Sequence, residues 1–397
     1  MTTLTDFPTS HAPRPARRAP ADDPLLTELC AELCAEFFAG LPRADQRAKG
    51  AVYVRGLLST RGRKSIRRLA AASGGAVSEQ GLHHFVSNST WDWRPVRATL
   101  ARYLARTTPV RAWVVRPVVT PKAGEHSVGV DRGFSAEVGQ LLNAQCAMGV
   151  WAASDAGGGP VNWRLHLPRT WLDDQDKRTR AAIPDDAGAE TVEGCAVSAA
   201  LETAGFWGLP VRPVVLDARS AGAAGAVRRF QAAGLPALVR VNPTMPLVPV
   251  HPVLPGRAAG PVAAKQVMAA VRHLRRPVYV PGSRSGEHTA AAVPVRLADG
   301  SREGRELVLF GHWSGRAAQP EYWLTDLVAT GPAALVSLSR LVGRVDQDFE
   351  RLTDRVGIRD YVGRSYDGWH RHVTLVSVAH AVAALGETVL ADDRHAS

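Results

Sequence analysis

Acidic side chains that follow apolar segments are the first candidates for chemistry in this sequence. The apolar run at residues 211–216 predicts a buried strand, and Asp217 follows it directly. A carboxylate at the carboxyl end of a strand can point into an open site, or it can cap the helix that follows. Later in the chain, Asp346 precedes Phe349 on a predicted helix, where a solvated acidic face explains it equally well.

A second candidate is a basic cluster that could contact phosphate groups. Residues 65–71 predict a short helix, Gly74 and Gly75 end it, and Ser78 can cap a second helix that runs through Val86. This spacing is that of a helix-turn-helix, in which the entry to the first helix holds the DNA backbone. An ordinary helical hairpin with a solvated basic face has the same pattern. The cluster consists of Arg61, Arg63, Lys64, Arg67 and Arg68.

Composition favours a polyanionic partner. The 397 residues include 48 Lys or Arg and 37 Asp or Glu, a net charge of +11, and cationic surfaces bind nucleic acid by displacing its counterions. Arg outnumbers Lys 43 to 5, however, so the bias of a GC-rich genome explains the excess equally well. The sequence contains no P-loop, dinucleotide fingerprint or GxSxG elbow.

The four cysteines have no CxxC spacing, which fits a reduced cytoplasmic protein without a structural zinc site. The N-terminus has no apolar signal region, and no stretch is judged to reach the ~18 apolar residues of a membrane span. We therefore expect a cytoplasmic protein, associated with the nucleoid when bound to DNA, and no membrane partner.

The order of the predicted elements indicates an α/β fold. Helical periodicity covers residues 25–107, and three strands follow near residues 112–115, 127–130 and 146–151. A helix, the strand that ends at Asp217, another helix and a strand at 237–241 come next. A meander followed by helix, strand, helix and strand resembles the ribonuclease H arrangement.

Six sequence phrases resemble the insertion-sequence 701 family of DDE transposases. They occur in the expected order over about residues 50–385, and together they are specific. The phrases lie at residues 126–132 (HSVGV with the following Arg), 165–174 (LHLPRTWLDD), 178–185, 321–324 (EYWL), 364–372 (RSYDGWHRH) and 379–381 (AHA).

The resemblance implies a ribonuclease H-like catalytic core with a β-rich insertion and an N-terminal helical DNA-binding domain. It also implies two Mg²⁺ ions held by three carboxylates, double-stranded DNA at transposon ends as the substrate, and a homo-oligomer on that DNA. The expected divisions are a disordered basic tail at 1–22, the helical domain at 23–107, the first part of the core at 108–245, the insertion at 246–320 and the C-terminal core helices at 321–388.

Transferred to this sequence, the family pattern makes Asp217 the second catalytic carboxylate and Asp346 the third, where the family has Glu. The first Asp should follow the strand at 112–115, but Arg116 stands there, and its positive charge opposes metal binding. Asp131, after the next strand, is the weaker substitute as a metal ligand, because an Asp there is usually a turn residue.

We therefore expect a DNA-binding transposase-family protein of DDE type, related to strand cleavage and transfer, with a degenerate catalytic triad. The alternative is a domesticated, catalytically inactive DNA-binding or regulatory protein. In the phrase at 364–372, Trp369, His370 and His372 either contact DNA or pack the last helix onto the core, and packing is the favoured interpretation.

Overall fold

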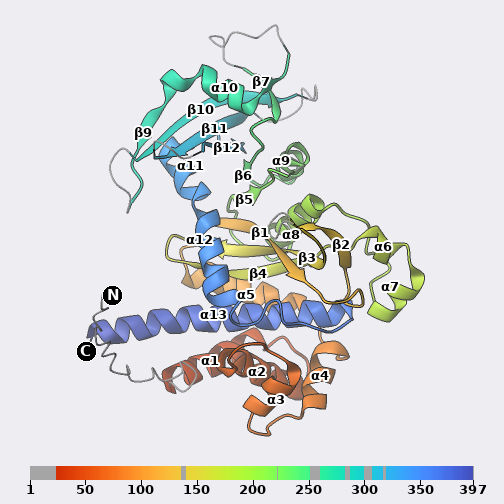
Figure 1. Ribbon diagram of the computed structural model, residues 1–397. Coiled ribbons are helices and arrows are strands. Elements are labelled where there is room, and N and C mark those ends of the chain that lie inside the picture. Colours follow the sequence, from red (N-terminus) through yellow and green to blue (C-terminus); the bar gives the residue numbers. More distant parts are fainter. Residues whose placement is uncertain are drawn as a thin grey trace, which may run out of the picture.

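The computed structural model describes residues 24–135, 140–220, 222–250, 260–281, 287–298, 306–315 and 319–396. The expected tail at 1–22 lies outside these residues. Figure 1 shows three tiers: a helical unit below the long helix α13, a sheet with its covering helices in the middle, and a further set of strands at the top.

The chain forms only helices between Pro24 and Thr107. α1 (Pro24–Phe37), α2 (Ala44–Ser59), α3 (Ile66–Ala72) and α4 (Glu79–Ser87) make up the lowest tier, and α5 (Arg94–Thr107) lies on the other side of α13, against the sheet (Figure 1). The predicted signals around α3 and α4 are confirmed: the Ser78 hydroxyl accepts a hydrogen bond from the backbone N–H of Gly81, and Gly74 and Gly75 both have positive φ, which ends α3.

A mixed sheet forms the middle tier. Its strands are β1 (Ala112–Pro121), β2 (Val130–Ser135), β3 (Gln140–Ala153), β4 (Gly158–Leu165), β5 (Val214–Asp217) and β6 (Ala237–Arg240). β3 is antiparallel to β1 on one side and to β2 and β4 on the other, whereas β5 is parallel to both β1 and β6. The strand expected at 127–130 begins only at Val130, because Gly129 turns the chain with φ 74°.

Helices link these strands. They are α6 (Arg169–Leu172), α7 (Gln175–Ala181), α8 (Val192–Phe206) and α9 (Ala223–Ala232). α8 packs on β3 and β4 and α9 on β6, while α6 and α7 project from the side of the sheet (Figure 1).

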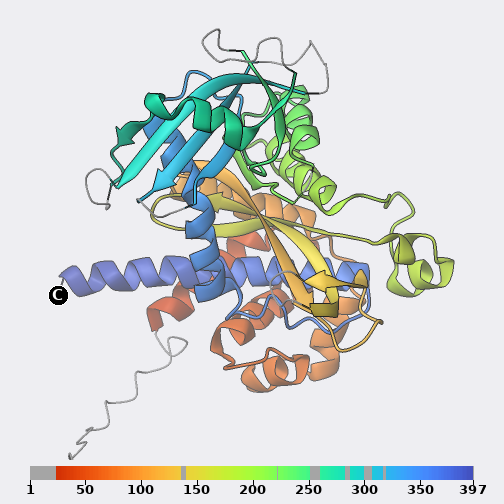
Figure 2. The ribbon, with the colours of Figure 1, turned by 45° about the horizontal axis from the view of Figure 1, so that its top comes forward.

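The expected insertion continues the same sheet. Its elements are β7 (Pro246–Pro249), β8 (Val262–Ala263), α10 (Ala264–Ala270), η2 (Arg272–Leu274), β9 (Arg276–Val278), β10 (His288–Leu297) and β11 (Leu307–Ser314). β12 (Glu321–Thr325) joins it to the core, because it pairs with β11 on one side and with β6 on the other. Figure 2 shows the strands of the insertion lying above the strands of the core.

The C-terminal helices connect all three tiers. They are α11 (Pro332–Ser339), α12 (Leu341–Asp348), the π-helix η3 (Phe349–Thr353) and α13 (Tyr366–Ala396). α12 packs against β1, β3, β4 and β5, and α13 lies between β4 and the helices α1, α2 and α4.

Helix α13 corrects one expectation from the sequence. Residues Tyr366–Leu390 are long and apolar enough to cross a membrane, by length and composition only. Such a helix is weak evidence for a span, because the core helix of a soluble protein passes the same test. Packing on both the lowest tier and β4 accounts for its apolar character here.

Candidate active site and basic surfaces

The candidate site lies where β1 and β5 run side by side. The paired residues end with Val115 opposite Leu216, so Arg116 and Asp217 come next on the two strands. β1 does not end at Arg116, as expected, but continues to Pro121 along β3. The register therefore brings a guanidinium, and not a second carboxylate, beside the strand that carries Asp217.

Asp217 is surrounded by arginines. The Arg219 Nε–H donates to Asp217 Oδ1 at 2.9 Å, and Arg219 Nη2 lies 2.8 Å from Oδ2. Arg240, the register partner on β6, places Nη1 3.6 Å from the same Oδ2. The hydrogen bond to Asp217 raises the pKa of the Arg219 guanidinium. Both carboxylate oxygens therefore already have cationic partners.

Asp346 is paired in the same way. It lies on α12, and its Oδ1 accepts a hydrogen bond of 2.7 Å from Arg116 Nε. The Arg116 guanidinium carbon also lies 3.7 Å from the centre of the Phe349 ring, a cation–π contact. Arg116 is 18% exposed and Asp346 48% exposed, so the pair fixes the sheet to α12 from a half-buried position.

A neighbouring carboxylate, Asp348, has a structural role that the sequence did not reveal. It is 2% exposed, and its Oδ2 accepts a hydrogen bond of 3.0 Å from the Gly158 backbone N–H. Arg344 and Arg351 lie 3.4 and 3.3 Å from its oxygens. Asp348 thus holds α12 to the start of β4, while the acidic residue two positions earlier faces the candidate site.

A line of polar side chains extends from Asp217 across the sheet. Arg240 Nη2 donates to Glu321 Oε1 on β12 at 2.8 Å, and His312 Nδ1 on β11 lies 3.9 Å from Glu321 Oε2. His312 Nε2 is 3.0 Å from His288 Nδ1 on β10. Burial raises the pKa of Glu321, but nearby His312 and Arg240 outweigh it and the pKa falls below its ordinary value.

These contacts do not fit a pair of divalent cations. Two ions need several carboxylate oxygens free to converge on them, whereas Asp217 and Asp346 are each paired with arginine. Over the described ranges, no group of three or more His, Cys, Asp or Glu residues is arranged to hold a metal ion.

Asp131 lies away from this site. It is exposed on the edge strand β2 and pairs with Ala144, which pairs in turn with Pro121, five residues along β1 from Arg116. With about 3.3 Å per residue and 4.8 Å per strand, the separation from Arg116 is roughly 19 Å. The sheet does not bring Asp131 together with Asp217.

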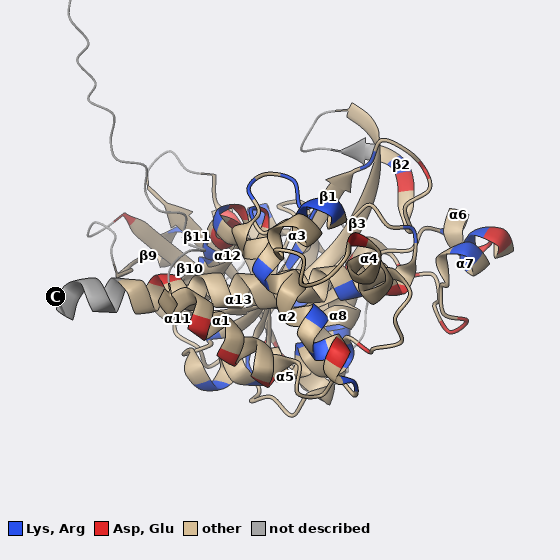
Figure 3. Cartoon of the chain, turned by 90° about the horizontal axis from the view of Figure 1, so that it is seen from below, with Lys and Arg blue, Asp and Glu red and all other residues tan. Residues whose placement is uncertain are grey.

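The basic cluster divides into four exposed residues and one buried one. Arg61, Arg63, Arg67 and Arg68 are exposed at the entry to α3. Lys64 is 6% exposed, its ammonium donates to the Thr60 carbonyl oxygen, and its backbone N–H donates to Asp360 Oδ2 at 2.7 Å. Lys64 therefore anchors the loop between α2 and α3 on residues 357–360. Figure 3 shows the chain from below, on the side of α2, α3 and α4, with Lys and Arg in blue.

The aromatic and histidine residues of the 364–372 phrase pack the core. Trp369, His370 and His372 are all buried, which confirms packing over exposure to DNA. The His372 Nε2–H donates to the Gly357 carbonyl oxygen at 2.9 Å and its Nδ1 accepts from Tyr53 Oη at 3.0 Å. Burial lowers the pKa of His372 to about 4.

His370 takes part in a buried network around Arg97. The guanidinium of Arg97 donates to Thr374 Oγ1 at 2.7 Å, Asn162 Oδ1 at 3.0 Å and the Trp163 carbonyl oxygen at 2.8 Å. It also donates to the His370 carbonyl oxygen at 3.1 Å. Arg97 therefore joins α5, β4 and α13 in the interior.

Residues 36–302 match the family described as DDE superfamily endonuclease. No curated protein matches the chain. Among solved structures, a piggyBac transposase synaptic complex with hairpin DNA is similar at a TM-score of 0.43 and 11% identity, covering 92% of this chain and 73% of the other.

Proposed function

Because this chain belongs to the DDE superfamily endonucleases, we propose that it is a DNA-binding protein of the transposase type whose catalytic site is degenerate. The insertion-sequence 701 family remains the proposed subfamily, on the six sequence phrases given above. Double-stranded DNA at transposon ends is the proposed partner, bound by a homo-oligomer in the cytoplasm, at the nucleoid.

A ribonuclease H-like core is supported by the order and direction of five strands. In the order β4-β3-β1-β5-β6, the strands β1, β3 and β4 form an antiparallel meander, and β5 and β6 are parallel to β1. We assign residues 108–245 and 321–388 to this core, 246–320 to the insertion and 23–107 to the DNA-binding unit.

The observation that carries the degeneracy is the position of Arg116. It follows the last residue of β1 that pairs with β5, next to Asp217, and it bonds to Asp346. The guanidinium that stands at the position of the first catalytic carboxylate is therefore bonded to the proposed third one. An arginine there neutralises the charge that would otherwise attract metal ions.

Members of this family generally use divalent metal ions, and Mg²⁺ is the implied cofactor. The arginine-paired carboxylates do not suit this ion. Asp131 lies roughly 19 Å from Arg116. It could replace the missing metal ligand only if β2 moved toward the site by more than about 10 Å.

DNA binding is tested by the salt dependence of affinity for a duplex. Each phosphate contact should contribute roughly 0.9 to the slope of log K against log salt. Replacing Arg61, Arg63, Arg67 and Arg68 with Ala should flatten that slope, whereas Arg94→Ala with Arg102→Ala, on exposed positions of α5, should not. An equal slope in the two variants would place the DNA surface elsewhere.

The second candidate is a domesticated, catalytically inactive DNA-binding or regulatory protein, and the arginine-paired carboxylates favour it specifically. The DNA around the gene separates the two. Terminal inverted repeats would support a mobile element, whereas a fixed place inside an unrelated operon would support domestication.

A further inference from the structure

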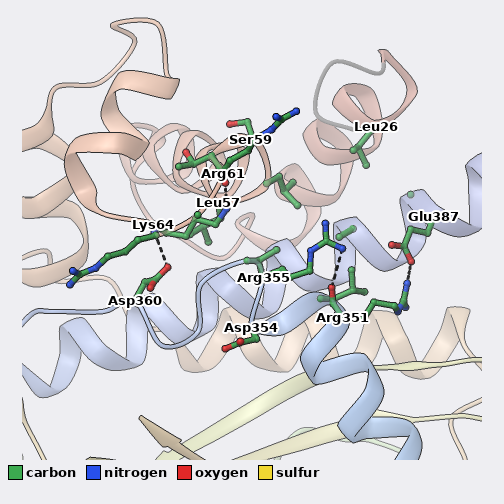
Figure 4. A pocket seen from close by; sticks show the side chains of 18 of the residues that line it. Leu26, Leu57, Ser59, Arg61, Lys64, Arg351, Asp354, Arg355, Asp360 and Glu387 are labelled. Carbon is green, nitrogen blue, oxygen red and sulfur yellow. Dashed lines mark hydrogen bonds and ion pairs between the residues drawn. The ribbon is translucent and has the colours of Figure 1, made fainter. Parts of the chain in front are cut away.

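Three cavities of about 700, 420 and 230 Å³ follow one another along the surface. The first lies between the α2–α3 loop and residues 351–360, and Figure 4 shows Arg61 and Lys64 on one side of it and Arg351 and Arg355 on the other. The second shares Arg63, Arg359 and Asp360 with the first. The third shares His126 and Arg364 with the second and reaches Lys177 and Arg180 of α7. Together they form one trough, here called the basic trough.

The charge of the basic trough is one-sided. Ten Lys or Arg residues line the three cavities, against four Asp or Glu. The difference of six is more than half of the chain's net charge of +11. A random spread of charge would not concentrate the excess along one depression. The positive potential of the basic trough should therefore attract a polyanion.

Two of these cations are not neutralised by the protein itself. Arg63 and Arg364 are exposed, and within the described part of the chain neither guanidinium has a carboxylate in ion-pair distance. Burial, and to a smaller extent the neighbouring Arg63, lower the pKa of Lys122 to about 8, although Asp360 opposes the shift. Uncompensated like charges held close together indicate a site that gains stability when an anion enters.

The basic trough also reaches the candidate site. Arg359, which lines the first two cavities, lies 5.4 Å from the centre of the Phe349 ring. Arg116 stacks on the same ring at 3.7 Å. A strand lying in the trough would therefore pass next to the helix that carries Asp346.

We propose that the basic trough binds the phosphodiester backbone of DNA, from the α2–α3 loop past residues 122–127 and 359–364 to α7, and that it does so without a metal ion. This inference rests on the proposed DNA-binding function. It adds contacts from the core and from α7, which the helix-turn-helix hypothesis does not include. Lys177 and Arg180 should contact phosphates as directly as Arg63 does.

Charge reversal tests the trough separately from the α3 cluster. The test variant is Arg180→Glu with Arg364→Glu, and the control is Arg102→Glu with Arg296→Glu. All four residues are exposed, and the charge change is the same. Duplex affinity is measured by fluorescence anisotropy in EDTA. We expect the test variant to weaken binding by at least about tenfold and to reduce the salt slope by roughly two, with less than about threefold loss in the control.

A footprint on the unmodified protein covers the case in which the variant misfolds. The chain has only five lysines, so amine acetylation read by mass spectrometry reports each one. DNA should protect Lys177 in the trough and leave Lys265, exposed on α10, as reactive as before.

The outcomes separate this inference from the function on which it rests. If the unmodified protein binds no DNA, the proposed function fails. If it binds DNA but the trough variant matches the control and Lys177 stays reactive, the trough inference is wrong while DNA binding stands. Protection of Lys177 by polyglutamate at the same charge concentration would also overturn it, because the surface would then bind any polyanion.

Discussion

Replacing Arg116 with Asp should convert an arginine-neutralised site into one that binds divalent cations. The substitution removes the ion pair to Asp346 and the stacking on Phe349. It also adds a carboxylate beside Asp217, at the position that follows the last β1–β5 pair. Without metal, the added carboxylate should repel Asp346. With metal, both become ligands, and Asp217 joins them by exchanging its contact with Arg219 for the ion.

The size of the effect follows from exposure. Asp346 is 48% exposed, so the lost ion pair contributes only about 1 kcal/mol, and the lost cation–π contact about 1 kcal/mol more. Adding carboxylate repulsion, we expect the metal-free variant to lose about 2 to 3 kcal/mol of unfolding free energy. Mg²⁺ at ten times its dissociation constant should return about 1.4 kcal/mol.

Metal binding is measured by EPR of free Mn²⁺ and by thermal melting with and without Mg²⁺. The matched control is Arg116→Gln, which removes the cation but adds no ligand. For a cooperative unit of this length, 1 kcal/mol corresponds to about 1 °C. Arg116→Asp, alone or with Asp346→Glu, should bind Mn²⁺. Its melting temperature should rise by about 1 to 2 °C when Mg²⁺ is added, because Mg²⁺ returns about 1.4 kcal/mol.

Two results would refute this reasoning. The unmodified protein should show no specific Mn²⁺ binding, and binding as tight as that of the Asp variant would mean that Arg116 does not block the site. Equal metal responses of the Asp and Gln variants would mean that the added carboxylate does not meet Asp217 or Asp346.

Two further predictions concern the core that positions the site. Burial lowers the pKa values of His372 and His380 to about 4, so the unfolded chain binds protons before the folded one as the pH falls below about 6.5. Urea unfolding should therefore show that the unfolding free energy at pH 5 is lower than at pH 7 by about 2 kcal/mol for each histidine. An equal unfolding free energy at the two pH values would contradict this prediction. Arg97→Met should cost about 1 to 3 kcal/mol, because it removes the buried side-chain donor of the Trp163 carbonyl oxygen, whereas Asn162 Oδ1 keeps the Trp163 N–H. A loss no larger than that of exposed Arg102→Met would show that the network contributes little.

Local signals in the sequence were sufficient for most elements of the fold. The Ser78 cap, the Gly74–Gly75 helix end and the apolar run before Asp217 each depend on neighbouring residues, and the structure contains all three features. The pairing of β6 with β12 depends on residues about 85 positions apart, and no local pattern specifies it. The continuity of the insertion with the core sheet was therefore not predictable.

Side-chain roles were harder to predict than elements. Lys64 and Arg63 are adjacent basic residues, yet Arg63 is exposed and Lys64 is buried, with its stem close to Gly357, which has φ 95°. Asp346 and Asp348 are likewise indistinguishable by type, and the distinction comes from the Gly158 N–H that meets Asp348. These contacts join segments far apart in the chain, so spacing alone could not reveal them.

The central claim is that this family member holds DNA at a site that no longer supports metal-dependent strand cleavage. The most direct measurement incubates the unmodified protein with a plasmid carrying the gene's own flanking DNA, in Mg²⁺ or Mn²⁺, and follows nicking and joining on gels beside an Asp217→Ala control. We predict that both proteins bind the DNA and that neither cuts it. Metal-dependent cleavage by the unmodified protein that disappears in Asp217→Ala would contradict the claim.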